Sequence, residues 1–175
     1  METLRSILAK LITWTGHFLI SCKINSLTDG IQQIENVTKN YQNLYSIQIV
    51  SHGNSGSLSI GSASLSNQNI ASYQTNFANI GNSLVKGGDL LIYACNVAAD
   101  EDGKKLVTGI AEYTLADVAA SIDLTGPTLL GGNSVLEFQT GKVTTPIINA
   151  NTLSEALWSD NNIESLSLIH ICRCR

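Results

Sequence analysis

The feature that most constrains this fold is the alternation of short apolar runs with amphipathic helical segments. Residues 45–51 and 89–94 are mostly apolar, and the second run is apolar throughout after its first residue, as in a strand buried on both faces of a sheet. Residues 28–41, 67–84 and 100–113 repeat apolar side chains at helical spacing. Strands separated by helices predict an α/β fold with a mostly parallel sheet, flanked by helices on both faces.

Shorter elements complete this prediction. Residues 57–60 alternate like a half-buried strand and, after a Gly61-Ser62 turn, form a hairpin that ends near Leu65. We expect a turn over residues 53–56, and two more strands over residues 116–122 and 134–139. The first 24 residues contain an apolar helical stretch and a strand, His17–Ile24.

Two reactive residue types follow the two central strands. His52-Gly53 comes directly after residues 45–51, and Cys95 directly after residues 89–94. The carboxyl ends of parallel strands share one edge, where open α/β sheets place their ligands. A thiol is a nucleophile as thiolate, and imidazole is the usual side chain for generating one. The pattern therefore indicates a Cys/His hydrolase.

A structural interpretation competes with the catalytic one. A single cysteine after a buried strand is often a small core residue, and His52 alone could be a turn residue that bonds a carbonyl group. Asn54 and Asn96 could orient the imidazole or simply stabilise turns. The sequence leaves these alternatives open.

Composition excludes several other classes. The net charge is −4 and the chain has no basic stripe, so we expect no nucleic-acid partner. No apolar stretch is long enough for a membrane span. The four cysteines form neither a disulfide framework nor a zinc knuckle. Asp100-Glu101-Asp102-Gly103 lacks the later ligands of a calcium loop and is typical of a helix start. We therefore expect no metal site and no cofactor.

The last ten residues have a separate origin in our interpretation. Leu166-Ser-Leu-Ile-His-Ile171 matches one translated frame of a transposase adapter used in DNA library preparation, and the residues after it fit the same adapter. We interpret residues 166–175 as a sequencing-adapter artefact. The natural protein is then expected to continue beyond this point.

A set of short motifs resembles a bacterial family, a domain of unknown function found near the start of very large surface or secreted proteins with cadherin-like and calcium-binding repeats. The shared pieces cover about two thirds of the chain: Asp29-Gly-Ile31, Ile47–Gly53, Gly56-Ser-Leu58, Ser72-Tyr73, Gly88–Tyr93, Cys95-Asn-Val-Ala98, Ala116–Ser121, Asp123-Leu-Thr-Gly126 and Gly131-Gly132.

That family in turn resembles the caspase-like, clan CD cysteine peptidases, with their His-Gly and Cys hallmarks. The resemblance implies a caspase-like three-layer sandwich in which Cys95 is the nucleophile and His52 the general acid/base. The N–H groups of Gly53 and Cys95 would form the oxyanion hole. Ser121 and Asp123 would lie near the substrate's first side chain, where a carboxylate favours Lys or Arg before the cut.

The resemblance also sets expectations about organisation and biology. Residues 1–24 are a divergent or mis-translated segment, 25–145 the caspase-like domain, and 146–165 a linker or the start of the next region. We expect a secreted or cell-surface peptidase module that acts on a peptide segment, including one of its own parent chain. Calcium activation is left open. The alternative is a non-catalytic structural or interaction module of a giant adhesin.

Overall fold

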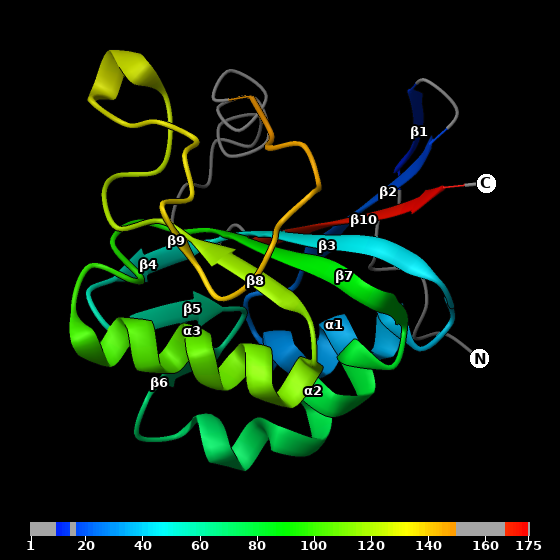
Figure 1. Cartoon of the computed structure of the whole chain (residues 1–175), viewed down its shortest axis with the longest axis horizontal. Helices are drawn as coiled ribbons and strands as arrows, with labels where there is room; N and C mark the ends of the chain where they lie inside the picture. The colour runs from blue at the N-terminus through cyan, green and yellow to red at the C-terminus, as the bar shows by residue number, and fades with distance from the viewer. Residues whose placement is uncertain (1–9, 15–16, 150–166, 175) are drawn as a thin grey trace.

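A computed structural model of the chain describes residues 10–14, 17–149 and 167–174. In this part of the chain the main sheet has seven strands, in the order β1-β2-β10-β3-β7-β8-β9 (Figure 1). These are β1 Lys10–Trp14, β2 His17–Ile24, β10 Ser167–Cys174, β3 Leu44–Val50, β7 Leu84–Tyr93, β8 Asp117–Ala120 and β9 Phe138–Gln139. A separate small sheet contains β4 His52–Asn54, β5 Ser57–Ile60 and β6 Ala63–Ser66. The α-helices are α1 Gly30–Thr38, α2 Gln74–Gly81 and α3 Glu101–Thr114, and 3-10 turns span Ile70–Tyr73 and Thr128–Leu130.

The centre of the main sheet is parallel. Strand β3 pairs with β7, and β7 with β8, in parallel register, with Ile47 beside Leu90 and Leu90 beside Val118. Strand β10 is antiparallel to both β2 and β3, so β2 points the same way as the parallel strands. Strands β1 and β9 are antiparallel additions at the two edges. The fold is mixed α/β around a parallel core.

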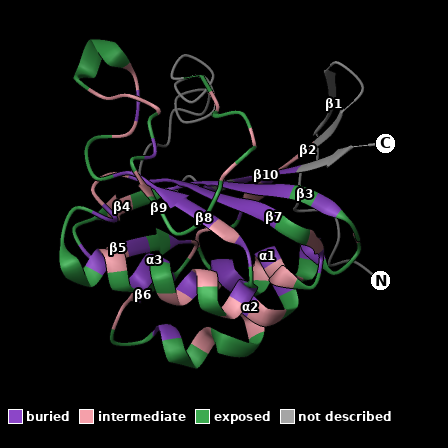
Figure 2. Ribbon diagram, viewed as in Figure 1, coloured by how far each residue is buried: buried purple, intermediate pink, exposed green. Residues whose placement is uncertain are grey.

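The described helices cover one face of the sheet only (Figure 1). They pack on the main apolar core, which includes Ile34, Phe77, Leu106 and Ile110 from the helices. The opposite face is covered by coil from the segment after β8, where Leu136 packs against a smaller apolar cluster of the sheet (Figure 2). Our expectation of helices on both faces is therefore wrong for the described residues, because a coil segment buries the second face.

Two of the three predicted helices form with shorter bounds, and the third, α3, is shifted by one residue. Asp29 caps α1 as expected, since its carboxylate accepts from the N–H groups of Ile31 and Gln32 at 2.9 and 3.0 Å. The helix expected over 67–84 is instead a 3-10 turn followed by α2, which ends at Gly81. Leu84 lies outside that helix because it pairs with Leu44 at the start of β7.

Several strand predictions also need correction. Residues 53–56 were expected to be a turn, but β4 extends through Asn54 because its backbone pairs with β5. Of residues 134–139, only Phe138–Gln139 form a strand, paired to the end of β8. Near the N-terminus, residues 10–14 form a strand rather than a helix, because they pair with β2 as a hairpin.

The segment over residues 136–149, which we call the strap, contains β9 and is otherwise coil, and it is fastened across the second face. Asp89 is 1% exposed, and one of its carboxylate oxygens accepts hydrogen bonds from the backbone and side chains of Thr144 and Thr145 at 2.7–3.1 Å. The Tyr93 hydroxyl accepts from the Ile148 N–H at 2.8 Å, and burial raises the pKa of Tyr93 to about 12. The strap is thus part of the folded core.

The C-terminal strand lies inside the sheet. Strand β10 inserts between β2 and β3, and Ile169 and Ile171 are completely buried in the main core. The Ser167 hydroxyl lies 2.6 Å from the Ser51 hydroxyl at the end of β3. Whatever the origin of residues 166–175, residues 167–174 form a structural strand in this chain.

Candidate functional site

The candidate site lies at the carboxyl-terminal edge of the parallel strands. The Ser51 N–H donates to the Tyr93 carbonyl oxygen at 3.0 Å, which joins the ends of β3 and β7. Immediately beyond this bond, the segment after β3 continues as His52-Gly53 in β4, and the segment after β7 continues as Ala94-Cys95. The parallel core therefore brings together the two sequence motifs that we expected to converge.

Gly53 makes the closest approach between the two motifs. A Cβ atom added to Gly53 would lie 2.5 Å from Val97 Cγ2, 2.9 Å from the Cys95 carbonyl oxygen and 3.0 Å from Ala94 Cβ. Two of these neighbours belong to packed side chains and one to backbone, so a larger residue has no free space there. The absence of a side chain at Gly53 lets the His52-Gly53 backbone lie against the segment that carries Cys95. His52 itself is exposed at this edge.

Cys22 and Cys95 occupy different environments. The Cys95 side chain is partly exposed, and its thiol donates to the Thr125 carbonyl oxygen at 3.5 Å. Cys22, in β2, is 2% exposed, and burial raises the pKa of its thiol. Reagents from solvent therefore have better access to Cys95 than to Cys22.

The loop that carries Cys95 is held by the loop after β8. The Asn96 N–H donates to the Asp123 carbonyl oxygen at 2.7 Å, and the Ala98 N–H donates to the Ser121 carbonyl oxygen at 3.0 Å. Asn96 has a φ of 58°, a left-handed conformation that asparagine tolerates better than most residues. The nucleophile candidate thus sits in a turn with a defined backbone.

Ser121 and Asp123 lie in this supporting loop, next to the site. The Ser121 hydroxyl is buried and donates to the Asp123 carboxylate at 3.1 Å. Both oxygens of the same carboxylate accept hydrogen bonds from the side-chain amide of Asn133, at 3.1 and 2.8 Å. The hydrogen bonds of the Asp123 carboxylate therefore join two parts of the loop after β8, and both donors are uncharged.

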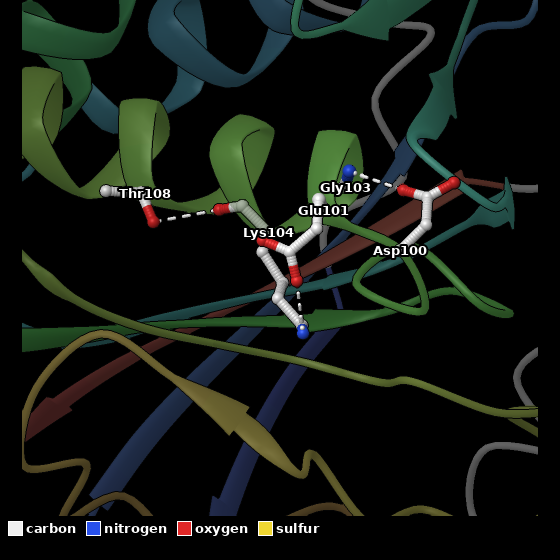
Figure 3. A network of polar contacts seen from close by, with 5 residues as sticks. All are labelled: Asp100, Glu101, Gly103, Lys104 and Thr108. Carbon is white, nitrogen blue, oxygen red and sulfur yellow. Dashed lines mark hydrogen bonds and ion pairs between the residues drawn. The ribbon is translucent and has the colours of Figure 1, made fainter.

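A second connection ties the His52 side of the site to α3. The Ser55 hydroxyl donates to one carboxylate oxygen of Asp100 at 2.7 Å. The other oxygen caps α3 by accepting from the Gly103 N–H at 2.7 Å (Figure 3). These bonds, led by that from Ser55, hold the pKa of Asp100 below its ordinary value. Residues 100–103 are therefore a helix start, as predicted.

The first turns of α3 carry further polar contacts. The Lys104 ammonium bonds the Glu101 carboxylate at 2.8 Å, and the Thr108 hydroxyl donates to the Lys104 carbonyl oxygen at 2.8 Å (Figure 3). Hydrogen bonding to Lys104 lowers the pKa of Glu101. The Glu101 side chain is 80% exposed and that of Lys104 is 40% exposed, so this surface pair contributes little to stability.

No local pattern in the sequence identifies several of these supporting residues. Thr125 and the Ser55–Asp100 bond act through contacts between segments that are distant in the chain, and Asn133 reaches Asp123 across their shared loop. An Asn or Ser in a Gly-rich loop has the same local pattern whether or not it reaches another loop. These residues could be found only with the topology in hand.

Neither a metal cluster nor a membrane helix is found in the described part of the chain. No group of three or more His, Cys, Asp or Glu side chains there is arranged to hold a metal ion. Within the same residues, no helix has the length and apolar character needed to cross a bilayer.

The fold and site define an α/β domain in which a His-Gly strand and a Cys-containing turn meet at the carboxyl edge of parallel strands. Residues 8–160 match the family described as Domain of unknown function (DUF4347), and the chain belongs to this family. No curated protein and no solved structure matches the chain. The matched stretch extends beyond residues 25–145 at both ends, and it includes β1, β2 and the strap but not β10.

Proposed function

We propose that this chain is a caspase-like cysteine peptidase module with Cys95 as nucleophile and His52 as general acid/base. The observation that carries the proposal is the close approach of Gly53 to the Cys95 backbone. A partly exposed thiol and an exposed imidazole on adjoining segments of one sheet edge are the groups that thiol proteolysis needs.

The proposed reaction proceeds through an acyl-enzyme. The Cys95 thiol transfers its proton to His52, and the sulfur attacks the scissile carbonyl carbon. The N–H groups of Gly53 and Cys95 would stabilise the oxyanion that forms. The C–N bond then breaks as His52 returns the proton to the leaving amine. Water hydrolyses the thioester with His52 as base, which releases the new carboxylic acid and regenerates the thiol.

The proposed biological setting follows from the resemblance of the motifs. The module would belong to a large bacterial surface or secreted protein and would cut a peptide segment of its own parent chain. In this account residues 166–175 are foreign to the natural protein and calcium is a candidate activator rather than a bound cofactor.

A second function is favoured by one specific contact. The Cys95 thiol already donates to the Thr125 carbonyl oxygen, as a structural cysteine in a packed turn would. In that case the domain would be a non-catalytic structural or interaction module of a giant adhesin.

Intact mass spectrometry of the parent segment, prepared from clean DNA, separates these functions. The parent, Cys95→Ala and His52→Ala proteins would be incubated with and without calcium. The peptidase proposal predicts new cleavage products in the parent alone. Cleavage that persists in Cys95→Ala would exclude this nucleophile, and the absence of cleavage from all three would favour the structural module.

A further inference from the structure

The loop that follows β8 exposes an unusual set of apolar side chains. Of the nine large apolar residues that are exposed in the described part of the chain, five lie within residues 122–135. They are Ile122, Leu124, Leu129, Leu130 and Val135, with exposed fractions from 43% to 96%. Large apolar groups gathered in this way mark interaction surfaces more often than ordinary solvent-facing coil.

Hydrogen bonds within the loop fix its conformation, and the apolar side chains are exposed in that conformation. The Asn133 N–H donates to the Leu124 carbonyl oxygen and the Gly126 N–H to the Asn133 carbonyl oxygen, both at 2.9 Å. A Cβ atom on Gly132 would lie 2.9 Å from the Gly126 backbone, so glycine permits this closure. The 3-10 turn Thr128–Leu130 forms the tip, which projects away from the sheet (Figures 1 and 2).

The base of the same loop contacts the candidate site. Its Thr125 carbonyl oxygen accepts from the Cys95 thiol, and its Asp123 carbonyl oxygen accepts from the Asn96 N–H. The loop that carries the exposed apolar side chains is therefore bonded, at its base, to the turn that holds the nucleophile candidate. A chain bound at Cys95 lies beside this loop.

The single charged side chain of residues 122–135, that of Asp123, is held by hydrogen bonds inside the loop. The Asp123 carboxylate is bonded to the neutral donors Ser121 and Asn133 within its own loop. No Lys or Arg lies between Lys105 and Lys142 in the sequence, so the loop offers no cation for an acidic partner. Apolar side chains are the groups that it presents outward.

We infer that the loop over residues 122–135 is a peptide-docking surface that selects segments with large apolar side chains beside the cut. This inference rests on the proposed peptidase function and replaces the basic preference expected from Asp123. Exposed leucines gain free energy when a peptide's apolar side chain removes them from water. Asp123 then acts as a positioning residue that shapes the loop.

The test uses binding, so that it does not depend on catalysis. Full-length Cys95→Ala protein would be titrated against two fluorescein-labelled peptides, Gly-Ser-Gly-Leu-Leu-Gly-Ser and Gly-Ser-Gly-Lys-Lys-Gly-Ser, by fluorescence polarisation. The same titrations would use a Leu129→Ser/Leu130→Ser variant of this protein. The control is Leu115→Ser, because Leu115 is 86% exposed but lies before β8, at the opposite end of that strand.

We expect the leucine peptide to bind more tightly than the lysine peptide and to lose about tenfold in affinity, or ~1.4 kcal/mol, in the tip variant. Leu115→Ser should leave binding unchanged. Equal or tighter binding of the lysine peptide, a leucine peptide that does not bind, or unchanged binding in the tip variant would each overturn the inference. So would self-association that the tip variant abolishes, since a second copy would then be the occupant. If the leucine peptide binds but the parent protein, which carries Cys95, does not cleave it, the docking surface would stand and the proposed peptidase function would be rejected.

Discussion

At the residue scale, Gly53 is the position on which the candidate site depends most directly. Its missing side chain allows the His52 segment to lie against the Cys95 segment. One of the atoms that a side chain there would meet is the backbone carbonyl oxygen of Cys95, at 2.9 Å. Backbone atoms cannot rotate away as a flexible side chain can. A methyl group at Gly53 must therefore move one of the two segments.

Gly53→Ala should lower the free energy of unfolding by about 1–3 kcal/mol, the usual cost of overpacking. Urea denaturation would measure it. The matched control is Gly109→Ala in α3, where the nearest atom is the end of the Ile70 side chain. That variant should be neutral or stabilising by up to about 1 kcal/mol, because alanine favours helix. Equal stability of Gly53→Ala and the parent would contradict the close packing of the two segments.

Asp100 links the two sides of the site through a charge. Because hydrogen bonds from Ser55 and Gly103 lower its pKa in the folded state, the ionised carboxylate stabilises the fold. That contribution is present above the ordinary carboxyl pKa of 3.8 and is lost as the pH falls through the lower folded value.

Asp100→Asn should therefore have a lower Tm than the parent at pH 7, and this difference should shrink as the pH falls below 3.8. Asparagine keeps the ability to cap a helix, so the comparison isolates the charge. Thermal unfolding followed by circular dichroism between about pH 2.5 and about pH 7 would measure it. A Tm difference that stays constant over this range would show that the charge is not responsible.

At the element scale, the strap replaces the helical layer that the strand-helix alternation predicted on the second face. Asp89 fastens it through Thr144 and Thr145, while the other carboxylate oxygen of Asp89 is buried without a protein partner. An acidic side chain at this depth is costly unless its hydrogen bonds are made. The strap bonds therefore matter more to stability than bonds on an exposed loop.

Thr145→Val should cost about 1.5–3 kcal/mol, because it removes the 2.7 Å hydroxyl bond to a buried carboxylate while keeping the side-chain shape. Thr108→Val is the control, since Thr108 is exposed on α3 and should change stability by no more than about 0.5 kcal/mol. Denaturant titration of both variants gives the comparison. Equal effects would mean that the strap is not fastened through this bond.

Strand β10 makes a second element-scale prediction. Removing residues 166–175 should destabilise this chain by roughly 3 kcal/mol or more, because burying each isoleucine contributes about 1.5–3 kcal/mol and both Ile169 and Ile171 are buried. Urea denaturation of the truncated and full chains would test this. If stability is unchanged, β2 and β3, which point the same way, close directly on each other.

At the scale of the whole molecule, the sequence predicted the parallel core and the meeting of His52-Gly53 with Cys95. Both followed from apolar runs and from the rule that parallel strands share an edge. The covering of the second face could not be predicted, because the strap is held by Asp89, Tyr93 and distant threonines rather than by a periodic pattern. The hydrogen-bond partners of Asp123 were missed because the closure of an irregular loop likewise follows no periodic pattern.

The position of the C-terminal strand shows another limit of sequence reasoning. The apolar residues of 167–174 are compatible with a strand, but its neighbours β2 and β3 lie far away in the chain. Pairing partners over such separations depend on which edges the rest of the fold leaves open. Strand existence is local information, whereas strand order is a property of the whole molecule.

The central claim is that His52 activates Cys95 at the shared sheet edge, and the rate of Cys95 alkylation tests it most directly. Iodoacetamide labelling at about pH 7 would be followed at each cysteine by peptide mass spectrometry in the parent and in His52→Gln. Buried Cys22 is the internal reference. The account predicts that Cys95 reacts much faster than Cys22 and slows by about tenfold in His52→Gln. Equal Cys95 rates in the two proteins would contradict it.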